Sequence, residues 1–170
     1  MSLIGHASEH AIRALTYMAQ NHGEGYHLVR SMAAELQLPQ AYLAKVLQPL
    51  AARGVLESQR GRGGGFRLAR PPREVRLHEI VDSQENLGRA RECFLGQAEC
   101  SDERACPMHE FWKRTSQDFL ARLQATTLQD VVRFCSERPE SGYPSVRPPS
   151  PRRRAKAPQR RPQRRRSRRV

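Results

Sequence analysis

The sequence predicts a mainly α-helical protein with a winged helix-turn-helix domain, a long C-terminal dimerisation helix and a disordered basic tail. Three observations carry this prediction. Apolar residues recur with helical spacing between residues 6 and 53, two alternating segments flank a glycine-rich turn, and Arg, Pro and Ser dominate after Cys135. We therefore expect a winged helix-turn-helix domain (1–86), a cysteine-containing loop with dimerisation helices (87–135) and a tail (136–170).

The first three expected helices form the helix-turn-helix. They cover His6–Gln20, Val29–Leu36 and Gln40–Arg53, and the last two are joined by a turn at Gln37–Gln40. Gly54 stands where a left-handed C-terminal cap is expected. The third helix has a buried face formed by Leu43, Val46, Leu47 and Leu50.

A β-hairpin and three further helices should follow. The expected elements are strands at Val55–Gln59 and Phe66–Ala69, a helix near Leu77–Gln84, a long helix from Pro107 to about Ala125, and a last helix capped by Thr127 and Asp130. The long helix carries the apolar residues Phe111, Trp112, Phe119 and Leu123. Trp112 and Phe119 are seven apart, so both are expected on one apolar stripe of this helix.

The basic charge lies mainly in the tail. The chain has a formal net charge of +13, and residues 136–170 hold 13 Lys and Arg against two acidic residues. The preceding residues therefore have a net charge of only +2. A near-neutral domain can still bind nucleic acid where its basic residues gather on one face. The tail buries too little apolar surface to fold.

The sequence indicates a cytoplasmic protein. Its apolar runs fall well short of the roughly 18 residues that span a bilayer, and Met1–Gly5 does not begin a signal peptide. Thiols stay reduced in the cytoplasm. The four cysteines are therefore expected to bind a metal or to sense redox state rather than to form structural disulfides.

The third helix and the hairpin tip supply the candidate DNA contacts. A recognition helix presents side chains near its N-terminus to base edges in the major groove. At the tip, glycines allow close approach to DNA, and Arg60, Arg62 and Arg67 supply positive charge. The candidate contacts are Gln40, Tyr42, Lys45, Arg60, Arg62 and Gly64.

Two other interpretations fit parts of these segments. Ordinary packed helices with solvated polar faces would give a similar helical pattern. A nucleotide-binding phosphate loop is disfavoured, because this turn runs into a strand and lacks the Gly-Lys-Ser/Thr signature.

Three cysteines and a histidine gather in one polar stretch. Cys93, Cys100 and Cys106 are separated by six and five residues, and His109 follows. Cys106 precedes Pro107 and is expected at the N-cap of the long helix, where unpaired N–H groups favour the metal-binding thiolate. Cys135 is expected to be a small buried hydrophobic residue.

The spacing favours an iron–sulfur cluster over a zinc ion. Structural zinc sites usually contain a Cys-x-x-Cys pair, which this chain lacks. Wider gaps suit a larger group held by thiolates. Zinc binding and a metal-free thiol switch remain as alternatives.

Several of these motifs together resemble the IscR/NsrR-type family of bacterial winged-helix iron–sulfur transcription regulators. The resemblance covers about residues 1–135 and rests on Tyr42-Leu43, Gly54-Val55-Leu56, the segment 60–68 and the cysteine triplet. It implies a homodimer whose long C-terminal helices cross, and a cluster that tunes operator binding. Arg60 stands where the family's wing arginine enters the minor groove.

The resemblance leaves two candidates for the fourth cluster ligand. In one branch of the family, a histidine at the place of His109 completes a 2Fe–2S site. In others, a carboxylate near the start of the first helix, here Glu9, reaches over from the partner subunit. We favour His109 because imidazole is the better iron ligand, and with it a 2Fe–2S cluster over 4Fe–4S.

We therefore expect a DNA-binding transcription regulator, a repressor, whose cluster senses iron–sulfur status, nitric oxide or redox stress. Its partners would be an operator in double-stranded DNA and a second copy of the chain, with neither a membrane nor a small-molecule substrate. The alternative is a metal-stabilised architectural protein that binds nucleic acid without sensing. An enzyme is disfavoured, since no Ser/His/Asp or paired-carboxylate arrangement stands out.

Overall fold

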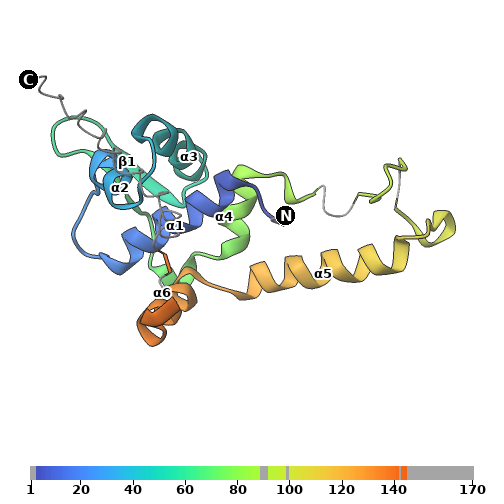
Figure 1. The fold of residues 1–170 in the computed structure, drawn as a ribbon. Helices are drawn as coiled ribbons and strands as arrows, with labels where there is room; N and C mark the ends of the chain where they lie inside the picture. Colours follow the sequence, from blue (N-terminus) through green and yellow to red (C-terminus); the bar gives the residue numbers. More distant parts are fainter. Residues whose placement is uncertain (1–2, 89–91, 99, 142, 145–170) are drawn as a thin grey trace, which may run out of the picture.

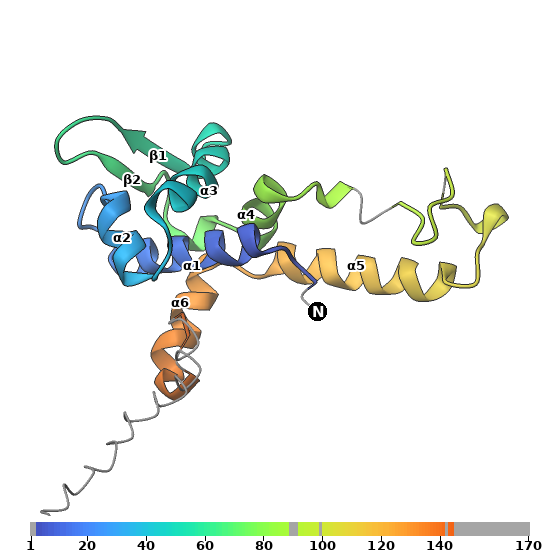
Figure 2. The same ribbon diagram turned by 45° about the horizontal axis from the view of Figure 1, so that its top comes forward.

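The computed structural model describes residues 3–88, 92–98, 100–141 and 143–144 and confirms the mainly helical winged helix-turn-helix architecture. A body of helices and one hairpin carries α5, which projects as a long arm, and α6 (Figures 1 and 2). The elements are α1 (His6–Gln20), α2 (Val29–Glu35), α3 (Gln40–Ala52), β1 (Leu56–Gln59), β2 (Gly65–Leu68), α4 (Leu77–Gln84), α5 (His109–Ala125) and α6 (Leu128–Glu137). Residues 145–170, most of the expected tail, lie outside the described residues.

The main hydrophobic core surrounds α1, which packs against α3, α4 and α6. Its largest fully buried side chains include Leu15, Met32, Leu47, Leu50, Ile80 and Leu128. Burying an aliphatic side chain of this size contributes about 1.5–3 kcal/mol. A smaller cluster of Val81, Leu87, Leu120 and Leu123 fastens the base of α5 to α4.

Two left-handed residues bound the recognition helix α3. Gln37, in the turn before it, has a φ of 53°, a conformation that costs energy for any residue with a side chain. At the other end Gly54 has a φ of 70°. The Val55 N–H donates to the Leu50 carbonyl at 3.0 Å and the Gly54 N–H to Ala51 at 3.1 Å. This is a Schellman cap, which satisfies the last carbonyls of the helix.

The wing is an antiparallel hairpin in which Leu56 pairs with Leu68 and Glu57 with Arg67. Leu56, Phe66 and Leu68 are buried, so one face of the ribbon covers the core. On the other edge of β2, an isolated antiparallel bridge pairs Phe66 with His27. The alternating pattern in the sequence therefore identified both strands correctly to within a residue.

The long helix differs from expectation at its start. Helix α5 begins at His109 with Met108 as N-cap, and the His109 N–H donates to the Cys106 carbonyl at 2.9 Å. The placement of Cys106 at the N-cap was therefore wrong, because the chain makes a turn at Pro107 before the helix starts. The apolar residues expected on the dimer stripe are only partly covered within the chain, because Phe111 is 57% exposed and Trp112 and Phe119 are half-buried. Their packing against a second copy stays a prediction.

Helix α6 has the expected capping box. The Thr127 N–H donates to Asp130 Oδ2 at 2.9 Å, and the Asp130 N–H donates to Thr127 Oγ1 at 3.2 Å. The helix continues to Glu137, past the expected boundary at Cys135. Residues 143–144 then return to α1, where Arg13 Nε donates to the Pro144 carbonyl at 3.1 Å.

In the part of the chain described, every helix is too short or too polar to cross a membrane.

Candidate functional site

The outer face of α3 is open for contact with a ligand. Leu43, Val46, Leu47 and Leu50 point into the core, whereas Gln40 and Lys45 are exposed. Tyr42 is half-buried, and its hydroxyl lies 3.3 Å from His10 Nδ1 on α1. The two rings meet edge to face with centroids 5.5 Å apart. Gln40 and Lys45 are therefore open to solvent on α3, whereas Tyr42 lies against α1, where His10 contacts its ring.

A groove of about 1030 Å³ separates the start of α2 and the outer side of α3 from the wing. Its polar lining includes Arg30, Gln40, Gln48, Gln59, Arg60 and Arg62. Arg60 and Arg62 are exposed, and no ion pair joins either to another described residue. Three guanidinium groups and several amides along one groove suit contact with phosphates and base edges. Arg30 was not selected from sequence, because nothing marked which face of α2 would border the wing.

Arg67, expected at the wing tip, lies elsewhere. Its guanidinium pairs with Glu57 at 2.6 Å across the hairpin and lies over the Tyr26 ring, 4.7 Å from the centroid. The Tyr26 hydroxyl also donates to Glu57 at 3.2 Å. The hydrogen bond from Arg67 lowers the pKa of the Glu57 carboxyl. The expectation that Arg67 adds free positive charge at the tip was therefore wrong.

Gly64 is buried within the turn of the wing. Its N–H donates to the Gly61 carbonyl at 3.0 Å, and a Cβ at this position would overlap the backbone of Gln59. This close approach requires glycine in the free protein. Contact between Gly64 and DNA stays a prediction.

The cysteine loop, residues 92–108, lies beside the far end of α5 (Figures 1 and 2). All four cysteines are free. Cys93 Sγ and Cys106 Sγ are 4.0 Å apart, and Cys100 Sγ lies 3.5 Å from His109 Nδ1. Cys135 is buried on α6, as expected for a small hydrophobic residue. The predicted ligands thus lie in two contacting pairs, Cys93 with Cys106 and Cys100 with His109.

The backbone favours a thiolate at Cys93. Hydrogen bonds from the N–H groups of Gln97, and then of Leu95 and Gly96, lower the pKa of the Cys93 thiol. The turn that directs these groups at the sulfur includes Gly96, whose φ is 79°. Burial, followed by the nearby Cys93 and Cys106, raises the pKa of Cys100. Such a donor set, with backbone donors around a ligand sulfur, fits a group bound by thiolates.

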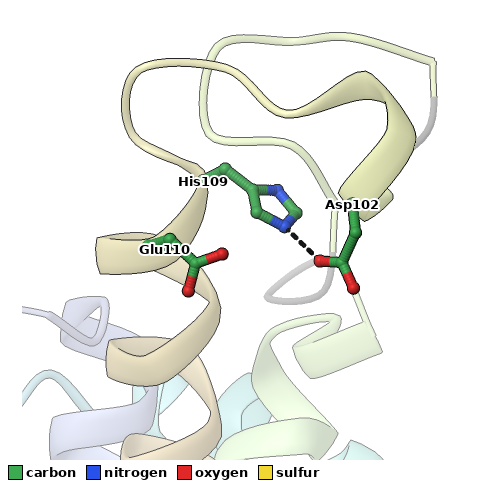
Figure 3. A group of neighbouring side chains, drawn as sticks. All are labelled: Asp102, His109 and Glu110. Atoms are coloured by element: carbon green, nitrogen blue, oxygen red, sulfur yellow. Dashed lines mark hydrogen bonds and ion pairs between the residues drawn. The ribbon is translucent and has the colours of Figure 1, made fainter.

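His109 is the most buried of the expected ligands, at 4% exposure. Its Nε2 lies 2.8 Å from Asp102 Oδ1, and Lys113 Nζ donates to the same oxygen at 2.7 Å. Figure 3 shows Asp102 facing the ring while Glu110 stands beside it on the helix. Asp102, His109 and Glu110 are close enough to hold a metal ion. Asp102 and Lys113 were missed from sequence, because a loop residue and a helix residue give no periodic signal of contact.

Glu9, the alternative fourth ligand, does not join the cysteines within this chain. It lies in the first turn of α1 and pairs with His6 at 3.5 Å, with half of its side chain exposed. Delivery of Glu9 from a partner subunit stays a prediction.

The fold and the groove define a class of protein: DNA-binding transcription regulators of the winged helix-turn-helix type. The Rrf2 family, described as iron-dependent transcriptional regulators, matches residues 4–133, and the chain belongs to this family. It is therefore a transcription regulator and not an enzyme.

Relatives support this assignment. Protein aau3 of Rhizobium meliloti (strain 1021) is 33% identical over 127 residues, which cover 74% of this chain and 82% of that protein. The regulator NsrR of Geobacillus kaustophilus (strain HTA426) is 31% identical over 74% of this chain and 86% of its own length. The structure of CymR, the global cysteine regulator of B. subtilis, superposes with a TM-score of 0.65 at 25% identity, covering 79% of this chain and 98% of CymR.

Proposed function

We propose that this regulator is a repressor whose operator binding is gated by an iron–sulfur cluster held by Cys93, Cys100, Cys106 and His109. The observation that supports the proposal is that the free thiols of Cys93 and Cys106 contact each other and that the thiol of Cys100 contacts the buried imidazole of His109. When bound, a cluster would supply redox- and nitric-oxide-sensitive chemistry at this site. A 2Fe–2S cluster is favoured, because the imidazole supplies a fourth ligand from the same chain.

The proposed DNA contacts are divided between α3 and the wing. Gln40, Tyr42 and Lys45 would read the major groove, while Arg60 and Arg62 would reach the adjacent minor groove or its phosphates. The exposure of Gln40, Lys45, Arg60 and Arg62 supports this division. The groove between α3 and the wing gives a path for one strand of the duplex. Such a regulator acts on DNA in the cytoplasm.

The proposed assembly is a homodimer formed along α5. An apolar groove of about 280 Å³ is lined by Leu3, Leu87, Trp112 and Phe119 among others. Phe111, Phe94 and Leu95 are each more than half exposed on the same arm. Apolar surface of this kind on a projecting helix suits a second copy of the chain. Sedimentation at micromolar concentration should give a dimer, and a monomer there would contradict this assembly.

One experiment tests the cluster and the gating together. The full chain is purified without oxygen, its iron and sulfide are counted, and its affinity for an operator selected from random duplexes is measured before and after exposure to nitric oxide. We expect a coloured protein whose operator affinity changes as the absorbance bleaches. Alanine at Cys93, Cys100 or Cys106 should give colourless protein with unchanged helical content, while Cys135→Ala, the matched control, should keep its colour.

Two results would replace the proposal. A colourless, zinc-loaded protein that binds all duplexes alike would favour the architectural alternative. A metal-free protein whose operator affinity responds only to thiol oxidation would favour a thiol switch.

A further inference from the structure

The imidazole of His109 has a polar partner at each ring nitrogen. Nε2 lies 2.8 Å from Asp102 Oδ1, and Nδ1 lies 3.5 Å from Cys100 Sγ. The ring is almost fully buried, at 4% exposure. A carboxylate only accepts hydrogen bonds, so the proton of a neutral ring belongs on Nε2. The lone pair on Nδ1 then faces the sulfur of Cys100.

The Asp102 carboxylate lies between two donors. Its side chain is 71% exposed, and its Oδ1 accepts from Lys113 Nζ at 2.7 Å as well as from His109 Nε2 at 2.8 Å. One oxygen of Asp102 thus faces both the ammonium and the ring.

Asp102, His109 and Glu110 also lie close enough together to hold a cation. The Lys113 ammonium already occupies the oxygen of Asp102 that faces the ring. A second cation at that oxygen would be repelled by the ammonium. The contacts therefore favour a role in orienting the imidazole over a separate metal site.

We propose that Asp102 is a positioning residue that holds His109 in the tautomer whose Nδ1 faces the cysteines. The inference rests on the proposed function, in which His109 is a cluster ligand. A histidine ligand commonly donates its second N–H to a carboxylate, and loss of that partner typically weakens metal binding by about 10- to 100-fold. Asp102 would thus set how firmly the cluster is held.

The neighbouring residue Glu103 provides a matched control. It lies in the same short 3-10 helix, Asp102–Arg104, and it is exposed. Glu103→Ala removes the same charge from the same loop without removing the contact to His109. Asp102→Asn retains an oxygen that can accept from Nε2, so it should rescue the tautomer in part.

The first measurement uses the full chain without its cluster. Nitrogen-15 NMR of the His109 ring should show the Nε2–H tautomer in the wild type, in Asp102→Asn and in Glu103→Ala. Asp102→Ala should give a mixture of the two tautomers. An unchanged ring signal in Asp102→Ala would overturn the inference, whatever the cluster does.

The second measurement follows the loaded protein. A chelator should remove iron about 10- to 100-fold faster from Asp102→Ala than from the wild type or Glu103→Ala. The nitrogen hyperfine coupling of the reduced cluster should weaken in the same variant. A further outcome is a wild type that shows the nitrogen coupling and an Asp102→Ala variant that has the same coupling and loses iron at the same rate. That result would refute the positioning role of Asp102 and leave His109 as a cluster ligand. A loaded wild type without any nitrogen coupling would instead refute His109 as a ligand.

Discussion

Gly65 in the wing lies directly against the carbonyl of His27, the residue that precedes α2 by two positions. The Phe66 N–H donates to that carbonyl at 3.0 Å, and the His27 N–H donates back to Phe66 at 2.8 Å. A Cβ added at Gly65 would overlap the His27 backbone. The wing is thus fastened to the helix-turn-helix through backbone atoms, and its angle to α3 depends on a residue without a side chain.

Gly65→Ala should therefore loosen the wing. Because the clash is with backbone, the bridge between His27 and Phe66 must open, at a cost of about 1–3 kcal/mol. Thermal unfolding should show the loss, and operator affinity should fall with it. Ser58→Ala, which changes an exposed residue of the same hairpin, serves as the control for stability and should leave the unfolding temperature unchanged. Equal stability of the two variants would contradict the docked wing.

Gln37→Gly should stabilise the domain. Gln37 has a φ of 53° in the turn between α2 and α3, and a left-handed residue with a Cβ costs about 1 kcal/mol. Gln48→Gly is the matched control, because Gln48 lies inside α3 and glycine there should cost about 1 kcal/mol. Denaturant unfolding should move the midpoint in opposite directions for the two variants. A shift to lower denaturant in both would contradict strain at Gln37.

The capping box of α6 should make stability depend on pH. The backbone N–H of Thr127, followed by its hydroxyl, lowers the pKa of Asp130 in the folded state. A lowered pKa means that the contribution is complete above the ordinary carboxyl pKa and is lost as pH falls through the folded value. Asp130→Asn should therefore destabilise the protein at pH 7 and differ less and less from the wild type as the solution is acidified. A difference that grows toward low pH would have the wrong sign.

Local sequence patterns predicted the helices and strands well, but they predicted poorly which side chains contact each other. Thr127 with Asp130 and Gly54 after α3 mark helix ends through contacts within a few residues, so their caps could be read from sequence. Cys106 was misplaced because Pro107 is compatible both with a first helical residue and with the turn that precedes α5.

The error at Arg67 has another origin. Charge alone indicated a DNA contact, whereas the register of the hairpin places Glu57 directly opposite. That partner could have been found by pairing the two strands. The contact of Asp102 with His109 could not be found in this way, because it depends on how an irregular loop folds back on α5.

Arg60 and Arg67 should differ sharply in their effects on DNA binding. Arg60 is exposed and without an ion pair among described residues, whereas Arg67 is paired with Glu57 and stacked on the ring of Tyr26. Arg60→Ala should lower affinity for the operator and reduce its advantage over random duplexes. Arg67→Ala should leave that advantage intact. Competition binding at one fixed salt concentration measures both, and equal losses would refute the distinction.

The tail should contribute salt-dependent binding without sequence preference. The structure shows where to cut, because α6 runs to Glu137 and Arg13 holds the Pro144 carbonyl. Removal of residues 145–170 takes away twelve of the thirteen basic residues that follow Cys135 and spares those contacts. Each phosphate that the tail neutralises adds roughly −0.9 to the slope of log K against log salt. The truncated chain should therefore bind operator and random duplex more weakly by similar factors, with a shallower slope for both.

Equal slopes for the full and truncated chains would mean that the tail does not reach DNA. A truncation that removed operator preference alone would instead assign sequence reading to the tail and not to α3 and the wing.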